Sequence, residues 1–391
     1  MVWQRRRVDR QRGQTLVLFA LIMALVVIPA VGLVVDGGYA LAQRRVAQNA
    51  SDFAALAGAR IVAERIGGNT VDGTDANVKA AITQSLAVNK GNPVTFGAPN
   101  GPRYVNTNGA YTCHDGTGAA QACTAGNVAT SYVGNGFIPT GPTALEAAGV
   151  VVGASLTWTP FFVGSLVGNW TASTTATAKG GYSTGAPGGN VFPAGIASAY
   201  FTGGRQPCGE TGPITGTVGG PDPCDPQHMT PGTLNVPGGF GWLKFGAAGK
   251  CTGYGLGMIN AGCDPSKTFL QVEIGPPSNS FGCCSAVATT TGGVVTGPPG
   301  NQIGSLPGNK ASADCTYYIN NDVIVTVPVW DKAGGTGDNA WYHIIGFTGW
   351  QLTKCDGGKD IEGVWRQEMN QGPTTLTPGF AGQALAIQLV H

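Results

Sequence analysis

One uninterrupted apolar run near the N-terminus dominates the pattern of hydrophobic and polar positions. Residues 14–35 read QTLVLFALIMALVVIPAVGLVV, contain no charged side chain, and have Gln14 and Thr15 as their only polar residues. A helix that rises about 1.5 Å per residue crosses a hydrocarbon core of about 30 Å in about 20 residues. A secretory signal usually has a shorter apolar core of about 7–15 residues, and a soluble core helix rarely stays apolar on every side. The run therefore predicts a retained transmembrane helix over residues 13–35, anchored by Leu16, Phe19, Leu21, Leu25, Val27 and Leu33.

Charged residues on the two sides of this run predict its orientation. Asp36 follows the run, whereas the first twelve residues contain one aspartate and five arginines, namely Arg5, Arg6, Arg7, Arg10 and Arg12. Basic residues beside a transmembrane helix remain in the cytoplasm. An arginine-rich arm is also typical of nucleic-acid binding, but directly beside an apolar span the arginines are better explained by topology. We therefore predict a single-pass cell-membrane protein with a cytoplasmic stub over residues 1–12 and the bulk of the chain extracytoplasmic or at the cell surface.

Helical periodicity continues beyond the apolar run. Apolar and small residues recur at spacings of three, four or seven, whereas Arg44, Arg45, Asp52 and Glu64 fall mostly elsewhere around the helix. This pattern predicts an amphipathic helix that extends the transmembrane one, with glycines at 37 and 38 as positions where it can bend. Residues 67–69 (GGN) end it, and residues 75–89 predict a second, shorter helix. The predicted packing face of the long helix consists of Tyr39, Val46, Phe53, Ala57 and Ile61.

The rest of the chain has the pattern of short strands separated by turns rich in Gly, Pro and Asn. Alternation predicts a pair of strands near 150–158 and 170–178, which complete a small sheet under the long helix within an α+β domain over residues 36–180. Residues 181–190 (GYSTGAPGGN) have the composition of a linker. A mainly β domain over residues 191–391 follows, and its clearest strands are 322–329, 340–353, 361–366 and 384–390. The predicted fold class is therefore α+β, with a long membrane-anchored helix at the N-terminus.

Composition supports a folded ectodomain and argues against a nucleic-acid partner. The chain has 391 residues, 42% of them apolar and only 11% charged, with 64 Gly and 25 Pro. The formal net charge is +1, and the first twelve residues contribute +4, so the remainder is about −3. A weakly negative ectodomain provides no field that would attract nucleic acid.

Ten cysteines all follow the apolar run, and their even number predicts a disulfide framework in an oxidising compartment. No C-x-x-C motif occurs, which argues against thiol redox catalysis and the common zinc modules. Closure of short loops suggests Cys113 with Cys123, Cys208 with Cys224, and Cys251 with Cys263. The adjacent Cys283 and Cys284 would then take Cys315 and Cys355 as two separate partners, in either combination.

Catalytic and nucleotide-binding motifs give no support for an enzyme. Residues 181–185 (GYSTG) fit G-x-S-x-G, but the residues after them cannot begin the helix that a nucleophile elbow requires. The four histidines are scattered, and His114 beside Cys113 and Asp115 is better explained as part of a disulfide loop than as a metal ligand. The chain contains no complete phosphate-binding glycine loop. We therefore predict no enzymatic activity, no cofactor and no small-molecule substrate.

The N-terminal region resembles the TadE/TadG-like family of tight-adherence (Tad/Flp) pilus systems. The resemblance covers residues 12–59, RGQTLVLFALIMALVVIPAVGLVVDGGYALAQRRVAQNASDFAALAGA. The family pattern is a basic stop with RGQ, an apolar span, Val-Asp-Gly, a tyrosine, two arginines and QNA-D-AALAGA. Residues 87–91 and the segment from 161 to 178 are similar to the body of these proteins. The positions that follow the pattern are Asp36, Tyr39, Arg44, Arg45, Gln48, Asn49, Ala50, Asp52 and residues 54–59.

The resemblance implies a bacterial membrane-anchored pilin-like or pilus-assembly protein rather than an enzyme. Its implied partners are membrane lipid and other pilus or pilus-assembly subunits. If the chain were cleaved after Gly13, its fifth mature residue would be Leu18, where classical type IV pilins have a glutamate. Some longer TadG-like proteins end in a domain with a D-x-S-x-S metal site. That motif is absent from this sequence, so we predict no metal of that type.

Two functional hypotheses follow. In the first, the chain is a structural or assembly component of a Tad-type pilus. In the second, it is an anchored surface adhesin whose C-terminal β domain binds a glycan, a surface or another envelope protein. The second hypothesis requires exposed aromatic side chains in that domain, and the candidates are Trp242, Trp330, Trp341, Trp350 and Trp365.

Overall fold

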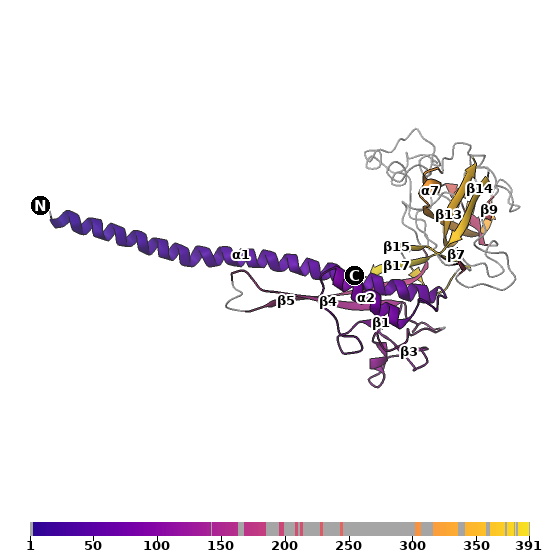
Figure 1. The fold of residues 1–391 in the computed structure, drawn as a ribbon, viewed down its shortest axis with the longest axis horizontal. Helices are drawn as coiled ribbons and strands as arrows, with labels where there is room; N and C mark the ends of the chain where they lie inside the picture. The colour runs from indigo at the N-terminus through magenta and orange to yellow at the C-terminus, as the bar shows by residue number, and fades with distance from the viewer. Residues whose placement is uncertain are drawn as a thin grey trace.

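The fold is described from a computed structural model of the whole chain (Figure 1). It combines a very long N-terminal helix with a mainly β body. The C-terminal β17 lies beside the far end of the helix, not beside its N-terminus. The residues that the structure describes are 3–141, 143–162, 168–184, 195–198, 208–209, 212–213, 227–229, 243–244, 302–305, 316–334, 341–356, 360–371, 374–378, 380 and 382–390, with side chains left out for some of them, including 3–15.

Helix α1 (Trp3–Ile66) is a single element of 64 residues. It includes Pro29 and continues without interruption through Gly37 and Gly38. The apolar run and the amphipathic segment are therefore one rod, as the periodicity predicts. Because a helix rises about 1.5 Å per residue, this rod is roughly 95 Å long, far longer than a membrane is thick. The C-terminal half of α1, beyond the apolar run, packs against the folded body.

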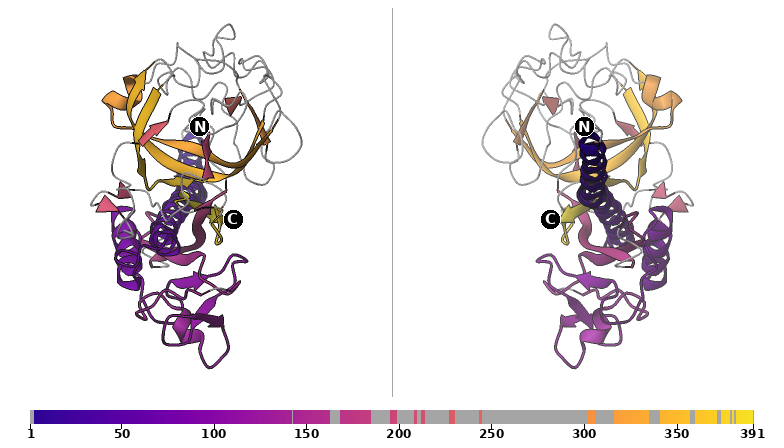
Figure 2. Two further views of the ribbon diagram at one scale, coloured as in Figure 1. Left: turned by 90° about the vertical axis from the view of Figure 1, so that its right-hand side faces the viewer. Right: turned by 90° about the vertical axis from the view of Figure 1, so that its left-hand side faces the viewer.

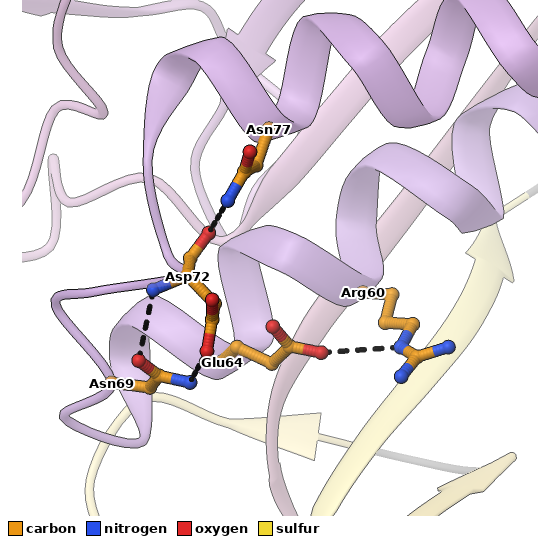
Figure 3. A network of polar contacts seen from close by, with 5 residues as sticks. All are labelled: Arg60, Glu64, Asn69, Asp72 and Asn77. Atoms are coloured by element: carbon orange, nitrogen blue, oxygen red, sulfur yellow. Dashed lines mark hydrogen bonds and ion pairs between the residues drawn. The ribbon is translucent and has the colours of Figure 1, made fainter.

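A tight polar turn joins α1 to helix α2 (Asp75–Val88), close to the predicted 75–89. Asn69 Oδ1 accepts hydrogen bonds from the backbone N–H groups of Val71 (3.1 Å) and Asp72 (3.0 Å), and its Nδ2 donates to Asp72 Oδ2 at 3.0 Å. Asn77 Nδ2 donates to Asp72 O at 2.8 Å (Figure 3). Thr74 then caps α2 by accepting from Asn77 N. Local side-chain acceptors of this kind favour a turn over a continued helix.

Substitution of Asn69 by alanine is expected to lower the free energy of unfolding by about 1 kcal/mol, because it removes the acceptor for two backbone N–H groups in an exposed turn. The measurement is urea unfolding of the full chain in detergent micelles. Thr70→Ala, at an exposed position of the same turn, is the matched control and should change stability by less than about 0.5 kcal/mol. Equal effects of the two substitutions would contradict this role of Asn69.

The first sheet lies against α1 and combines strands from both halves of the sequence. Its order is β1-β4-β5-β17-β15, with β16 also paired to β5. Strands β4 and β5 form a long antiparallel hairpin, and β17 pairs antiparallel with the second half of β5. The hairpin confirms the two strands predicted from alternation near 150–158 and 170–178. The bounds are β1 Arg103–Val105, β4 Gly149–Trp158, β5 Trp170–Ser183, β15 Met369–Gln371, β16 Thr374–Thr375 and β17 Leu385–Val390.

The core of this layer lies between the helices and the sheet. Helix α1 packs against β4, β5, β17 and α2. Side chains of α2 and of the sheet supply the larger apolar groups, whereas α1 contributes mostly alanine. Burial of this apolar surface is the main driving force for closing the layer. The larger buried residues are Val62, Val78, Ile82, Leu86, Tyr104, Val133, Val150 and Val152.

A small lobe projects from the first sheet between β1 and β4. It contains β2 (Thr112–His114), β3 (Ala120–Ala122) and the 3₁₀ helix η1 (Val128–Ser131). A disulfide joins Cys113 to Cys123, which confirms the pairing that the sequence suggests for these two cysteines. In Figure 2 this lobe and the C-terminal sheet lie on opposite sides of the helix.

The second sheet belongs to the C-terminal part of the chain. Strands β12 (Ile324–Gly334) and β13 (Trp341–Asp356) form a long hairpin, and β14 (Asp360–Arg366) continues it. The short helix α7 (Thr316–Asn320) precedes β12. Further short strands complete this sheet: β6 pairs with β12, β11 with β13, and β7 and β9 with β14, whereas β8 pairs with β7 and β10 with β11. Their bounds are β6 Ile196–Ala197, β7 Cys208–Gly209, β8 Gly212–Pro213, β9 Gln227–Met229, β10 Leu243–Lys244 and β11 Gln302–Ser305.

The two sheets do not correspond to the two domains that the sequence predicts on either side of a linker at residues 181–190. Residues 181–183 are the last part of β5, so the predicted linker is wrong at its start; residues 185–190 lie outside the described part of the chain. The last strand, β17, completes the first sheet instead of the second. A backbone hydrogen bond from Ala384 N, just before β17, to Phe347 O of β13 (2.6 Å) joins the two sheets, whereas the bond from Leu385 N to Glu368 O (2.9 Å) extends the pairing of β17 with β15. The sequence pattern predicts a strand at 384–390 but not its partner, which is more than 200 residues earlier.

Candidate functional site

The apolar half of α1 extends away from the body and exposes its side chains. The six predicted anchoring residues are between 43% and 73% exposed. Within the described residues, one helix is long and apolar enough to cross a membrane, and its most apolar stretch is almost entirely unburied. A core helix of a soluble protein would instead be covered by the body. The exposed apolar surface therefore fits a membrane anchor.

The five arginines that predict the orientation lie in the first turns of α1. Their backbone is helical, and their side chains lie outside the described part of the structure. Their place at the end of α1 distant from the folded body is visible in Figure 1. The predicted topology of the chain thus stays a prediction.

The soluble half of α1 packs through a different stripe from the predicted one. Phe53 is 53% exposed, so the prediction is wrong at this position. Tyr39, Val46, Ala57 and Ile61 are half-buried, at the edges of the contact. The buried stripe consists of small residues, namely Ala47, Ala50, Ser51, Ala54, Ala55, Gly58, Ala59 and Ala63, together with Val62.

Close approach of the backbones explains why small residues form this stripe. A Cβ atom at Gly58 would lie 2.8 Å from Val150 Cγ2, and one at Gly180 would lie 2.5 Å from the carbonyl oxygen of Ala59. The helix therefore rests almost directly on β4 and β5. A large side chain such as that of Phe53 has no space in this interface and points elsewhere. The alanine-rich motif AALAGA is the surface that makes this approach sterically possible.

A polar contact at Ser51 joins the helix to the sheet, and a second polar pair lies within the helix itself. Ser51 Oγ lies 3.2 Å from Thr174 Oγ1 on β5, so the two hydroxyls share a hydrogen bond across the interface. Gln48 Nε2 donates to Asp52 Oδ1 at 2.7 Å, one turn further along the helix. Gln48 and Asp52 thus form a local pair, whereas Ser51 is the residue that reaches the strand.

Asp36 is the acidic residue that directly follows the apolar run of α1, and its side chain is completely buried. Its side chain is 0% exposed. Its Oδ1 accepts a hydrogen bond from the backbone N–H of Phe161 at 2.8 Å, and its Oδ2 accepts from that of Phe162 at 3.1 Å. Residues 161 and 162 follow the end of β4, at the distal end of the β4–β5 hairpin. Asp36 therefore attaches the tip of the hairpin to the helix.

Aromatic rings surround this attachment. Tyr39 packs edge-to-face on Trp158 (6.4 Å between ring centroids) and on Phe161 (5.4 Å), and Trp158 packs in the same way on Trp170 (6.4 Å). Such pairs contribute about 0.5–1.5 kcal/mol each beyond the burial of their area. A Cβ atom at Gly32 would lie 2.9 Å from the ring of Phe162, so the absence of a side chain at Gly32 lets this ring rest on α1.

The hairpin and the helix enclose an open groove of about 640 Å³. Gly37, Leu41 and Arg44 line it from the helix, and Trp158 and Trp170 line it from the hairpin. In Figure 1 the β4–β5 hairpin extends back along α1 toward the N-terminus, which brings this groove to the end of the body nearest the apolar half. We call this region, defined by Asp36, Tyr39, Trp158, Phe161, Phe162 and Trp170, the juxtamembrane cluster.

The sequence identifies some members of this cluster but not their relationship. Asp36 and Tyr39 follow the resemblance pattern, and 161–168 is recognisable as an apolar piece between two strands. Nothing in the local sequence connects positions 36 and 161, because their contact depends on the length and register of the hairpin. The sequence feature that could have indicated this contact is the acidic Asp36 at the end of an apolar helix, because a buried carboxylate requires a hydrogen-bonding partner.

The residues that the sequence offered as candidates for catalysis or metal binding lie in a strand and beside a disulfide. Ser183 of the G-x-S-x-G match is a buried strand residue, and its backbone N–H donates to Ala384 O at 2.7 Å. His114 lies beside the Cys113–Cys123 disulfide, and burial lowers its pKa below the usual value although Asp115 and Asp75 act in the opposite direction. Among the described residues, no three His, Cys, Asp or Glu side chains gather in a way that could hold a metal ion.

The aromatic residues proposed for an adhesive surface are mainly core residues. Trp330, Trp350 and Trp365 are at most 8% exposed, which contradicts their assignment to an exposed binding patch. Trp350 and Trp365 stack on each other across β13 and β14, with 5.2 Å between ring centroids and 18° between planes. The side chains of Trp242 and Trp341 lie outside the described part of the structure.

The remaining suggested disulfides are not tested by the structure. The backbones of Cys208 and Cys355 lie in β7 and β13, but their side chains are outside the described residues. The other six cysteines, 224, 251, 263, 283, 284 and 315, also lie outside them. The disulfide-rich character of the C-terminal part thus stays a prediction.

Comparison with known proteins gives one match. Residues 13–60 match the model of the family described as "Putative Flp pilus-assembly TadE/G-like". This match confirms the resemblance seen in the sequence of the N-terminal region. No curated protein and no solved structure matches the chain. The matched segment begins with the apolar half of α1 and ends within its buried stripe.

Proposed function

We propose that this chain, with its TadE/G-like segment at residues 13–60, is a single-pass, membrane-anchored, pilin-like structural or assembly component of a Tad/Flp-type pilus. The observation that supports this most is the coincidence of the match with α1. The matched residues supply both the exposed apolar surface that fits a membrane anchor and the small-residue stripe on which the first sheet packs. Residues 13–60 thus form most of the helix on which the first sheet packs.

The proposed orientation keeps residues 1–12 in the cytoplasm and the bulk of the chain extracytoplasmic. Its support is the asymmetric distribution of arginines around the apolar run. The proposed partners are membrane lipid and other pilus or pilus-assembly subunits, with no nucleic acid and no small-molecule substrate. Phe53 is exposed on the soluble half of α1, outside the buried stripe, and Leu41 is exposed at the groove beside the hairpin; both side chains offer apolar contacts for a neighbouring subunit.

The alternative proposal, an anchored surface adhesin, loses part of its support. The burial of Trp330, Trp350 and Trp365 removes three of the five aromatic residues that it requires. The pairing of β17 with β5 also makes the C-terminal half continuous with the first sheet. We therefore place the adhesin function second. Under both proposals the chain has a structural or binding role and is not an enzyme.

Mechanical shearing of intact cells tests the proposed function. Antibody against the ectodomain should detect the chain in the sheared filament fraction if it is a pilus subunit, and in the membrane fraction if it is an assembly component. The subunit would be slightly shorter than the full chain if residues 1–13 are removed. Detection of the chain as soluble cytoplasmic protein would contradict both forms of the proposal.

A chain that lacks residues 1–35 separates the assembly role from the adhesin role. It retains both sheets and the buried stripe of α1, so its folded body stays complete. A secreted adhesin body should still bind cells or surfaces, whereas an assembly component without its anchor should bind neither and should fail to restore pili. Surface binding by this truncated chain would favour the alternative.

A further inference from the structure

We propose that the tip of the β4–β5 hairpin, by which we mean residues 161 and 162 after the end of β4, is a second membrane-contacting element, which inserts Phe161 and Phe162 into the lipid interface beside α1. This inference rests on the proposed membrane anchoring of α1. It assigns a lipid-binding role to a segment more than 120 residues away from the anchor in the sequence. The argument depends on the depth of the tip, its exposed apolar surface and the way in which its polar groups are satisfied.

The first step is the position of the tip along the anchor. The ring of Phe162 lies against Gly32, at 2.9 Å from the Cβ position that glycine leaves empty. Gly32 lies three residues before Val35, the last residue of the apolar run, and therefore about 4.5 Å inside its end. If the apolar run occupies the hydrocarbon core, Phe162 lies at the edge of that core.

The second step is the apolar surface that the tip exposes. Phe161 is 74% exposed and Phe162 is 49% exposed. On α1, Val31, Leu33, Val34 and Val35, which lie within three residues of Gly32, are exposed as well, so this level of the molecule exposes apolar side chains from both the helix and the hairpin. In water such a surface would be unfavourable, whereas in a bilayer it is covered by lipid chains.

The third step is the arrangement of the amphipathic rings. Tyr39 is in edge-to-face contact with Phe161 and with Trp158, and Trp158 is in edge-to-face contact with Trp170. Tyrosine and tryptophan favour the membrane–water interface, because their rings are apolar and each has one polar group. A group of interfacial residue types thus lies directly beside the two phenylalanines.

The fourth step concerns the polar groups at this depth. A carboxylate and free backbone N–H groups are both costly at the edge of the hydrocarbon unless they are hydrogen-bonded. Asp36 and the tip satisfy each other, since the two carboxylate oxygens accept from the N–H groups of Phe161 and Phe162. Non-helical backbone can therefore approach the lipid without leaving these groups unpaired.

Site-specific photocrosslinking in the full-length chain tests this inference. The chain is reconstituted into phosphatidylcholine vesicles, and Phe161→p-benzoylphenylalanine supplies the probe. Leu25→p-benzoylphenylalanine is the positive control, since Leu25 is exposed within the apolar run. Val71→p-benzoylphenylalanine is the negative control, because Val71 is highly exposed at the opposite end of α1. All three positions are exposed, so the substitutions leave the packing of the core unchanged.

The expected result is a lipid adduct at positions 161 and 25 and none at position 71. An adduct at 25 without one at 161 would overturn the inference while leaving the membrane anchor intact. An adduct from 161 to a second protein chain in place of lipid would also overturn it, in favour of subunit docking. Absence of lipid adducts at both 161 and 25 would overturn the membrane anchoring itself, and the inference with it.

A second variant tests whether Asp36 positions the tip. Asp36→Ala removes both acceptors for the tip N–H groups, so the lipid adduct at position 161 should fall while the adduct at position 25 is retained. Asp52→Ala is the matched control, because Asp52 lies on the same helix and contacts Gln48 instead of the hairpin. An unchanged adduct at 161 in the Asp36→Ala chain would overturn the role assigned to this carboxylate.

Discussion

Substitution of Asp75 by alanine is expected to lower the free energy of unfolding by about 3–5 kcal/mol, because it leaves a buried hydroxyl and two N–H groups without an acceptor. Asp75 is buried at the start of α2. Its Oδ1 accepts from Tyr104 Oη at 2.6 Å and from Gly134 N at 2.9 Å, and its Oδ2 accepts from Gly136 N at 2.8 Å. One carboxylate thus joins α2, β1 and the loop after η1.

The pKa of Tyr104 supports the role of Asp75 as the acceptor of its hydroxyl hydrogen bond. Burial is the main reason that the pKa of Tyr104 lies well above its usual value, and the charge of Asp75 and the hydrogen bond between them raise it further. The hydroxyl therefore keeps its proton at neutral pH and is the donor to Asp75. The position of Asp75 in the first turn of α2 adds a favourable interaction with the helix dipole.

The measurement is urea unfolding of the full chain in detergent micelles, followed by hydrogen exchange in α2 and the loop at 130–136. Tyr104→Phe removes one of the three hydrogen bonds but keeps the ring, and it should cost about 1–2 kcal/mol. Asp72→Ala is the matched control, because Asp72 is an exposed aspartate just before the same helix, and it should cost about 1 kcal/mol or less. Similar effects of Asp75→Ala and Asp72→Ala would contradict the role of Asp75.

The second large effect is a dependence of stability on pH caused by Glu368. Burial raises the pKa of Glu368 to about 7, although the hydrogen bond from Thr326 and the nearby side-chain amide of Asn370 act in the opposite direction. Thr326 Oγ1 donates to its Oε1 at 2.6 Å, while its Oε2 is buried without a hydrogen-bond partner among the described residues. Glu368 lies in the chain between β14 of the second sheet and β15 of the first, and its side chain contacts Thr326 of β12, so this residue lies where the two sheets meet.

The sign of the effect follows from the raised pKa. Between pH 4.5 and pH 7 the folded chain retains a proton that the unfolded chain has lost, so the free energy of unfolding falls as the pH rises. The contribution is fully present below about pH 4.5 and is lost as the pH passes about 7. The difference between a pKa of about 7 and the usual 4.5 corresponds to roughly 3 kcal/mol. A mildly acidic pH should therefore stabilise the folded chain at the junction between the two sheets.

Comparison of the wild-type chain with Glu368→Gln isolates this effect, because other carboxylates contribute equally to both. At pH 8 the variant should be more stable than the wild type by up to roughly 3 kcal/mol, and at pH 4.5 the two should be nearly equal. Asp331→Asn, at an exposed position of β12, is the control and should show no such difference. Parallel pH profiles for the wild type and Glu368→Gln would contradict the prediction.

Acid stabilisation at this junction has a structural consequence. The contacts of residues 382–385 with Phe347, Thr348 and Glu368 hold the C-terminal sheet on the first sheet. Gln383 Nε2 adds a hydrogen bond to Ser183 O at 2.7 Å. Because β17 is itself part of the first sheet, loosening this junction would also affect the layer that packs on α1. We therefore expect stability changes at Glu368 to extend beyond the second sheet.

Several features follow from the local sequence alone, because each depends on neighbouring residues. The length and uniform polarity of the apolar run are sufficient to predict a helix of membrane-spanning length. Thr74 and Asn69 place the turn before α2, and alternation predicts β4 and β5 close to where they lie. The short loop between Cys113 and Cys123 makes their disulfide predictable. The TadE/G-like resemblance also depends on a contiguous segment.

Only the tertiary structure decides the features that depend on distant residues. The packing face of α1 is formed by alanines, glycine and serine instead of Phe53, because the space left by β4 and β5 excludes large side chains. The place of β17 in the first sheet depends on pairing across some 200 residues, which no local pattern encodes. Asp36 acquires its partners only when the hairpin is long enough to reach back along the helix. The sequence alone determines which elements form, whereas side-chain volume and strand pairing determine which faces of those elements meet.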